Sequence, residues 1–277
     1  MLELLQYTFF RNALLAALLS AISCGIIGTY IVARRMVFIG GGITHASFGG
    51  IGIAYFLGIN PIFGAAVFAV LSAFGINYFS QSGNIRQDSS IAIWWSLGMA
   101  VGIVFIALTP GYSPNLMSFL FGSILTVTTA DLIYMASLSV VISVLFLLFF
   151  RLIMMISFDE EFAKARNLPV KFFNYLLMAL SSLVIVASIR VSGVILVLSL
   201  LTLPQATANL FTKKFSSIMV SSILIGFIGM VTGLVVSYYT NLPSGATIIL
   251  VLTAFFGIGK LGVSLLRLRK NTGNLVG

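Results

Sequence analysis

Eight apolar stretches of close to twenty residues recur along the chain, and this pattern constrains its fold more than any other feature. A membrane-spanning helix needs about 20 consecutive apolar residues, and in lipid it must satisfy its own backbone hydrogen bonds. Only 8% of the 277 residues are charged, whereas soluble domains carry about a quarter. We therefore expect an all-α polytopic membrane protein with about eight to nine transmembrane helices and no soluble domain.

The expected spans are separated by short polar turns, and residues 1–277 together form a single transmembrane domain. We place the spans at 14–33, 38–57, 62–79, 91–108, 131–150, 172–189, 217–239 and 247–266. Residues 115–125 are too few to cross, which predicts a short re-entrant or interfacial helix. Residues 191–203 can cross only if the sequence "QATANLF" after Pro204 extends them beyond the hydrocarbon.

Basic residues are distributed very unequally between the two sides of this arrangement. If Arg34 and Arg35 are cytoplasmic and the spans alternate, only Arg11 and Arg190 among the loop cations lie outside. Because cytoplasmic loops carry an excess of Lys and Arg, this predicts an external N-terminus and a cytoplasmic C-terminus. The same rule explains the formal net charge of +9, which therefore does not indicate a nucleic-acid partner.

The stretch "RRMVFIGGGITHASFGG" at 34–50 contains His45, the only histidine of the chain. Ionisable side chains inside membranes usually face a bundle interior or a water-filled path, so His45 is a candidate for the substrate pathway. The alternative is a neutral histidine that hydrogen-bonds to a helix backbone and contributes only packing. Beside it, small residues repeat at a spacing of four and predict close helix packing: Gly42, Ala46, Gly50 and Ala54.

Residues 157–169, "SFDEEFAKARNLP", predict a short amphipathic helix on the cytoplasmic surface. Ser157 and Glu160 have the spacing of a capping box, and Asn167 and Pro169 are residues that end helices. A solvated connector without a further role is the alternative.

A second short cytoplasmic helix is predicted at 204–215, where Pro204 ends the preceding apolar stretch. Small and polar side chains there precede two lysines at the inner membrane face, which suits docking to a cytoplasmic partner. A plain helix–helix turn is the alternative. The candidate docking residues are Pro204, Gln205, Ala206, Thr207, Ala208 and Asn209.

The remaining motifs indicate structure rather than chemistry. Asp131 predicts a cap for the span after "TVTTA", and Trp94 and Trp95 fit an aromatic belt at a membrane interface. Cys24 is the only cysteine, so no intrachain disulfide can form. Nucleotide-binding, zinc-protease and serine-hydrolase motifs are absent from the sequence, so we expect a chain that is not itself an enzyme.

Five segments, in this order, resemble the ABC-3 family, the membrane permeases of metal-type ABC importers. They are "RRMVFIGGGITHASFGGIGIAYFLGINP", "LFGSILTVTTADL", "SFDEEFAKARNLPV", "GVILVLSLLTLPQATANL" and "LPSGATIILV". The resemblance covers nearly the whole chain and implies a permease subunit for zinc, manganese or iron uptake across a prokaryotic cell membrane. It also implies a homodimer, a cytoplasmic pair of ABC ATPase subunits and an extracytoplasmic metal-binding protein. The coupling helix is then expected within 204–215, with the metal as a transient substrate and no tightly bound cofactor.

One position departs from the family pattern. The family commonly has an aspartate four residues before the histidine, and Gly41 occupies that position here. Carboxylate oxygens suit Mn²⁺, and imidazole suits zinc and iron, so the pattern leaves the metal open. We expect His45, Thr44 and backbone carbonyls near Gly40–Gly42 to line the pathway, with two copies of His45 meeting in the dimer.

Two alternative functions follow from the same sequence. A permease for a metal chelate or siderophore would need no ligating side chains, because the chelator already holds the metal. A self-contained secondary transporter or channel is the alternative from another class. Coupling to an ion gradient usually requires intramembrane carboxylates, and the sequence places none near the midplane.

Overall fold

The computed structural model describes residues 6–81, 85–110 and 124–273, and the regular elements within these ranges are helices. In order they are α1 (Thr8–Ala33), α2 (Val37–Phe56), α3 (Pro61–Gln81), α4 (Gln87–Leu108), η2 (Ile124–Thr126), α6 (Thr129–Phe158), α7 (Glu160–Ala165), α8 (Val170–Leu200), α9 (Leu203–Phe211), α10 (Phe215–Thr240) and α11 (Ser244–Gly273). In the described part of the chain, nine stretches are long and apolar enough to cross a membrane, which confirms the expected fold class. The short helix predicted at 115–125 lies almost wholly outside the described residues.

Several helices extend beyond the spans predicted for them, α1 and α6 among them. α1 begins at Thr8, and α6 continues to Phe158 after a local departure from helical geometry at Phe149 (φ −110°, ψ 19°). The cap predicted at Asp131 is a capping box in which Thr128 is the N-cap residue and Asp131 the third helical residue. The Asp131 carboxylate accepts a hydrogen bond from the Thr128 backbone N–H at 3.0 Å. Apolar length alone therefore located these spans but not their polar ends.

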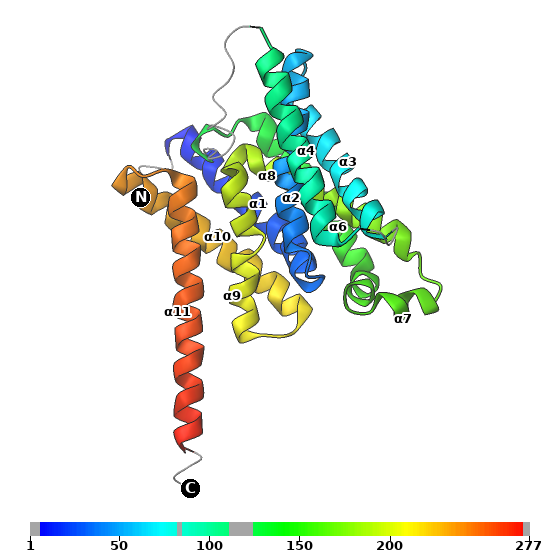
Figure 1. The fold of residues 1–277 in the computed structure, drawn as a ribbon. Coiled ribbons are helices and arrows are strands. Elements are labelled where there is room, and N and C mark those ends of the chain that lie inside the picture. Colours follow the sequence, from blue (N-terminus) through cyan, green and yellow to red (C-terminus); the bar gives the residue numbers. More distant parts are fainter. Residues whose placement is uncertain (1–5, 82–84, 111–123, 274–277) are drawn as a thin grey trace.

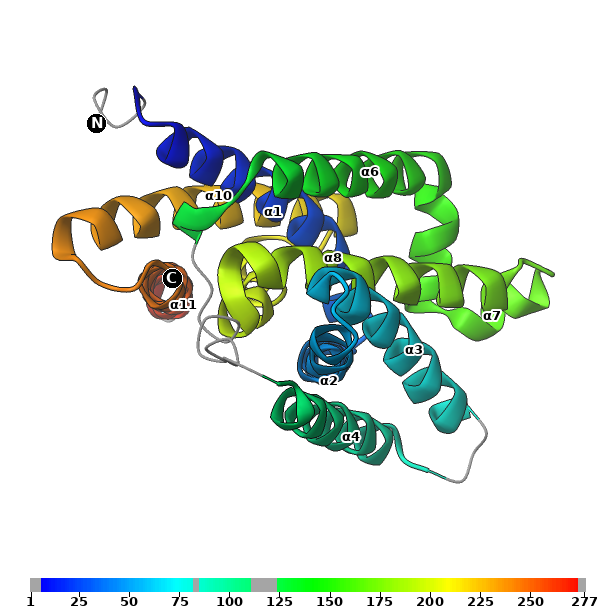
Figure 2. The ribbon, with the colours of Figure 1, turned by 90° about the horizontal axis from the view of Figure 1, so that it is seen from above.

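α8 joins two stretches that the sequence analysis placed in separate spans. Gly193 interrupts it with φ 74° and ψ 165°, a left-handed conformation that favours glycine. The chain changes direction within α8, as Figures 1 and 2 show together. The second candidate span of this region is Ser192–Phe211, so the crossing predicted at 191–203 requires α9 to complete its length.

The helices run in two main directions. In Figure 2, α2, α4 and α11 are seen end-on, whereas α6, α8 and α10 lie lengthwise across the view. α2 contacts α3, α4 and α8, and 78% of its most apolar part is buried, so it lies at the centre of the packing. α11 stands at the edge, and its C-terminal half projects away from the other helices in Figure 1.

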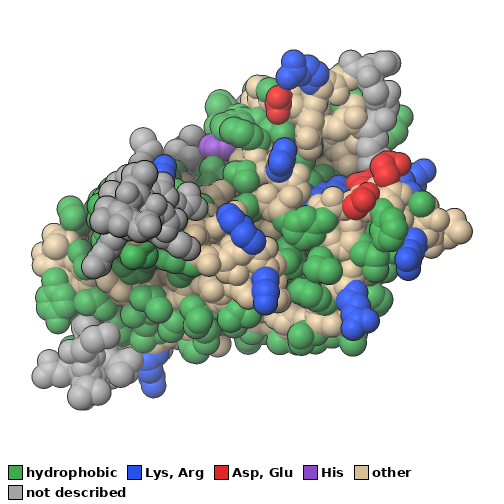
Figure 3. Space-filling view, turned by 90° about the horizontal axis from the view of Figure 1, so that it is seen from below, with side chains coloured by type: hydrophobic (Ala, Val, Ile, Leu, Met, Phe, Trp, Pro, Cys, Tyr) green, Lys and Arg blue, Asp and Glu red, His purple; other side chains and the backbone are tan. Residues whose placement is uncertain are grey.

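Basic loops gather at one end of the molecule. The α1–α2 and α9–α10 links, the start of α4 and α7 all lie toward the lower end of Figure 1, and Figure 3 shows Lys and Arg side chains spread over this face. Arg35, Arg86, Lys213 and Lys214 are among the exposed cations. The shared location is consistent with alternating spans, and the assignment of this end to the cytoplasm stays a prediction from the charge rule.

Candidate functional site

α2 and α4 pack with backbone against backbone around His45. A Cβ atom added to Gly98 of α4 would lie 2.5 Å from the Ala46 Cα, and one added to Gly49 would lie 2.9 Å from the Gly98 carbonyl oxygen. Gly52 and Gly102 approach each other in the same way one turn further along. Such contacts exclude any side chain between the helices, so they fix the position of α4 relative to α2.

The small-residue stripe of α2 contacts two helices rather than one. Its contacts are Gly42 with Ile91 and Ala46 with Gly98 on α4, and Gly50 and Ala54 with Gly64 on α3. Gly41, on the adjoining stripe, faces α8 instead. The nearest atom to a Cβ added at Gly41 is Leu198 Cδ2 at 3.6 Å, an ordinary van der Waals contact. α2 is therefore held by α3 and α4 on one side and touches α8 less closely on the other.

The imidazole of His45 stacks on the indole of Trp95 from α4. The ring centroids are 4.1 Å apart and the ring planes differ by 6°. His45 is half-buried and Trp95 is 39% exposed. Both nitrogens of an imidazole lie in its ring plane, so the stack covers one face of His45 and leaves the ring edge for a ligand.

The oxygen donors expected beside His45 are engaged within α2. Thr44 is buried, and its hydroxyl donates to the Gly40 carbonyl at 2.6 Å. α2 is helical from Val37 to Phe56, so the expectation of freed carbonyls near Gly40–Gly42 is wrong. Among the described residues, no group of three or more His, Cys, Asp or Glu side chains could hold a metal ion. The described part of one chain thus offers a metal a single imidazole at this place.

α9 brings only part of the predicted docking segment to the surface. Phe211, at its C-terminal end, is 66% exposed, and the two lysines that follow are exposed too. Of the predicted docking residues, the buried ones are Pro204, Gln205, Thr207 and Ala208, and the partly exposed ones are Ala206 and Asn209. The surface that α9 can offer a partner is therefore the narrower strip from Ala206 and Asn209 to Phe211.

Gln205 joins α9 to the interior. Its side-chain amide donates to the Cys24 carbonyl of α1 at 2.9 Å and to the Leu200 carbonyl at 3.3 Å. A Cβ atom added at Gly28 would collide with this side chain, so α1 lies directly against it. Gln205 thus holds the start of α9 and belongs to the core rather than to a docking surface.

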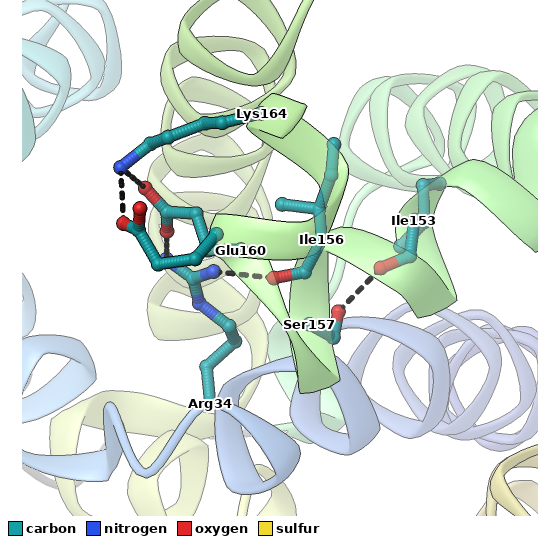
Figure 4. Close-up of polar contacts among 7 residues, drawn as sticks. Arg34, Ile153, Ile156, Ser157, Glu160 and Lys164 are labelled. Atoms are coloured by element: carbon teal, nitrogen blue, oxygen red, sulfur yellow. Dashed lines mark hydrogen bonds and ion pairs between the residues drawn. The ribbon is translucent and has the colours of Figure 1, made fainter. Parts of the chain in front are cut away.

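A charged cluster ties the C-terminal end of α1 to α7 (Figure 4). The Arg34 guanidinium donates to the Glu160 carboxylate at 2.9 Å and to the Ile156 carbonyl at 2.7 Å, near the end of α6. Lys164 forms ion pairs with Glu160 at 3.2 Å and with Glu161 at 2.9 Å. α1, α6 and α7 are therefore held together by charge-assisted contacts at this end.

The ionisation of Glu160 follows from the same contacts. Burial alone would raise its pKa, but hydrogen bonds from Arg34 and Lys164 and the positive charge of Arg34 outweigh burial and hold the pKa below its ordinary value. The hydrogen bonds of Lys164 to Glu161 and Glu160 raise the pKa of Lys164. Both partners are therefore charged at neutral pH.

The helix predicted at 157–169 is shorter than expected, and its cap is different. α7 covers Glu160–Ala165, and Asp159 is its N-cap, accepting a hydrogen bond from the Phe162 backbone N–H at 2.9 Å. The Ser157 hydroxyl instead donates to the Ile153 carbonyl at 2.6 Å. The predicted Ser157–Glu160 capping box is wrong because α6 continues through Ser157, whose own turn satisfies the hydroxyl.

Comparison with known proteins identifies the family. The model described as the ABC 3 transport family matches residues 6–261. The chain belongs to the ABC 3 transport family. This confirms the resemblance drawn from the five sequence segments.

Named relatives of this ABC 3 protein cover most of its length. It is 42% identical to an uncharacterized membrane protein of Synechocystis sp. over 91% of this chain and 89% of that protein. It is 36% identical to the manganese transport system membrane protein MntC of Halalkalibacterium halodurans, over 92% of this chain and 88% of that protein. The solved structure of PsaBC from Streptococcus pneumoniae in complex with Fab matches with a TM-score of 0.83 and 35% identity, covering 92% of both chains.

Two features of this ABC 3 protein were not predicted from its sequence. Trp94 packs against Gly75 of α3 and Trp95 stacks on His45, whereas the interfacial belt expected for them stays a prediction. The Arg34–Glu160 pair was also missed. The packing of α4 on α2, which brings Trp95 to His45, could have been suggested by the glycine repeat in α4. Its residues Gly98 and Gly102 match the small residues of α2. Charges of opposite sign, in two segments that the sequence analysis placed on the same side of the membrane, could have suggested the Arg34–Glu160 pair.

Proposed function

We propose that this chain is the transmembrane permease subunit of an ATP-binding-cassette importer for a divalent metal ion, with manganese as the first candidate. Membership of the ABC 3 transport family supports the class, and the relative named as a manganese transport system membrane protein supports the metal. The metal is a passing substrate in this proposal, and ATP hydrolysis belongs to a separate subunit.

The observation that carries the pathway assignment is the half-buried His45 on α2, whose ring is stacked face to face on Trp95. A neutral imidazole nitrogen binds divalent transition metals, but Mn²⁺ prefers carboxylate oxygens. With Gly41 in place of a carboxylate, His45 should hold Mn²⁺ weakly. Weak binding suits a permease, since the ion must leave on the other side. Two chains in a homodimer would bring two His45 side chains to one path.

The partners follow from the same assignment. A cytoplasmic pair of ABC ATPases would dock on the exposed strip of α9, and an extracytoplasmic protein would deliver the metal. The exposed lysines after α9 and the exposed Lys164 of α7 support a cytoplasmic location for this end. We place the chain in a prokaryotic cell membrane with its C-terminus in the cytoplasm.

Transport by purified components tests the proposal. The permease is reconstituted in vesicles with its ATPase and external binding protein, and ATP-dependent uptake of Mn²⁺, Zn²⁺ and Fe²⁺ is compared. His45→Ala should reduce uptake of the transported metal by at least about tenfold without lowering membrane abundance. Phe38→Ala, on the same helix and 76% exposed, is the control and should transport normally. Normal uptake by His45→Ala would make His45 a packing residue, and preferred uptake of Zn²⁺ or Fe²⁺ would reassign the metal.

A further inference from the structure

The stacked pair of His45 and Trp95 is the closest ring contact in the described part of the chain. Its centroid distance is 4.1 Å with nearly parallel planes, whereas Trp94, the neighbouring residue, lies 6.4 Å from Phe79 at a tilt of 38°. Trp95 is on a different helix from His45 and remains 39% exposed. The indole of Trp95 thus lies flat on the imidazole while part of its surface stays exposed.

The packing of α4 on α2 explains why the two rings meet face to face. Gly98 lies one turn after Trp95 on α4, and it contacts Ala46, the residue after His45 on α2. Because no side chain separates the backbones there, neither helix can slide without breaking the stack. The helix pair thus fixes the positions from which the two side chains extend, and the two rings lie against each other.

We propose that Trp95 is a positioning residue for metal passage at His45, an inference that rests on the function proposed above. The indole blocks one face of the imidazole and restricts rotation of the ring, so the nitrogen lone pairs point in a fixed direction. Metal binding also makes the imidazole electron-poor, and an indole face stabilises positive charge above it. Trp95 therefore increases the affinity of His45 for a divalent cation.

The emission of Trp95 gives the first test. The chain has two tryptophans, so Trp94→Phe leaves Trp95 as the only one. Addition of Mn²⁺ to this variant in lipid nanodiscs should change the emission saturably, because the metal binds to the ring on which the indole is stacked. His45→Gln in the same background should abolish the change. The inference would be overturned if the emission does not change on addition of Mn²⁺ although metal uptake by the protein depends on His45.

Transport kinetics give the second test. Trp95→Leu keeps an apolar side chain without a ring, and it should raise the KM for Mn²⁺ by about threefold to tenfold, the range expected for loss of an aromatic contact. The maximal rate and the membrane abundance should stay the same. Trp95→Phe keeps a ring that can stack and should restore most of the affinity. A wild-type KM in Trp95→Leu would overturn the inference.

The outcomes separate this inference from the proposed function. If His45→Ala abolishes uptake while Trp95→Leu transports with a wild-type KM, the permease assignment stands and the role of Trp95 is wrong. If His45→Ala transports normally, the pathway assignment itself is wrong. If Trp95→Leu fails to insert in the membrane, the emission test in the Trp94→Phe variant decides whether Trp95 acts on metal binding. A saturable change on addition of Mn²⁺ supports that role, and no change overturns it.

Discussion

At the scale of single residues, the glycines of α2 differ in what an added side chain would meet. At Gly50 a Cβ atom would collide with the Gly64 carbonyl of α3, which cannot move without its helix. At Gly41 the nearest atom would be Leu198 Cδ2 at 3.6 Å, the end of a flexible side chain. Gly50 is therefore required by packing, whereas Gly41 has room for a larger residue.

Gly41→Asp should consequently insert at normal abundance and place a carboxylate one helical turn from His45. Because Mn²⁺ favours carboxylate oxygens, we expect its affinity to rise relative to Zn²⁺, by about tenfold or 1.4 kcal/mol. Competition between the two metals in the vesicle uptake assay measures this ratio. Gly50→Asp is the matched control and should be lost from the membrane. An equal loss of Gly41→Asp would show that the space at Gly41 is smaller than its contacts indicate.

At the scale of elements, α9 combines a buried face with an exposed strip. Ala208 is 1% exposed against its neighbours, whereas Ala206, half a turn away, is partly exposed. The same small residue type thus has opposite roles on one short helix. Composition could predict the helix, but only the packing separates its two faces.

Charge placed on the two faces should have different effects. Ala206→Glu should leave the permease folded and reduce association with the ATPase or uncouple its hydrolysis from transport. Ala208→Glu should destabilise the fold by about 3 kcal/mol or more, because it buries an unpaired charge. Membrane abundance and co-purification of the ATPase distinguish the two. Full transport and association in Ala206→Glu would move the docking surface elsewhere, and α7 is the next candidate.

The ion pairs between α1 and α7 predict a dependence on pH. The pKa of Glu160 in the folded protein lies below its ordinary value of 4.5, so the pair contributes stability above pH 4.5 and loses it as pH falls through the lowered pKa. Glu160→Gln should therefore lower stability at neutral pH, by about 1 kcal/mol for a partly exposed pair. Thermal unfolding of both proteins should converge as the pH falls below the ordinary glutamate range. Curves that differ equally at all pH values would contradict this assignment.

At the scale of the whole molecule, the alternating spans predict which loops are accessible from outside. Asn60 follows α2 and Asn167 follows α7, and both are exposed at opposite ends of the proposed arrangement. A cysteine at Asn60 should react with an impermeant thiol reagent added outside intact cells, and one at Asn167 should not. The native Cys24 is buried and should not react with the reagent. If Asn167→Cys is labelled while Asn60→Cys is protected, the orientation in the membrane is the reverse of the predicted one.

Much of the fold could be predicted because lipid leaves few choices to an apolar stretch of helical length. The break at Gly193 could not, since a glycine without a neighbouring proline is common within membrane helices. The partner of His45 was also beyond prediction. Trp95 meets it only because of the relative positions of α2 and α4, which depend on contacts such as Gly98 with Ala46. A single sequence reveals the glycines but not which of them face each other.

The glycine contacts of α2 have a mechanical consequence. Where backbones touch directly, no rotamer can change to absorb movement, so α2, α3 and α4 should travel as one rigid block. Against α8 the contacts of α2 are different, because Leu198 and Leu201 reach Gly41 and Gly40 through side-chain ends at 3.6 Å and 3.8 Å from an added Cβ. Such side chains can exchange rotamers as two surfaces slide. If His45 lines the route as proposed, we expect any shear that opens and closes it to occur at the boundary between this block and α8.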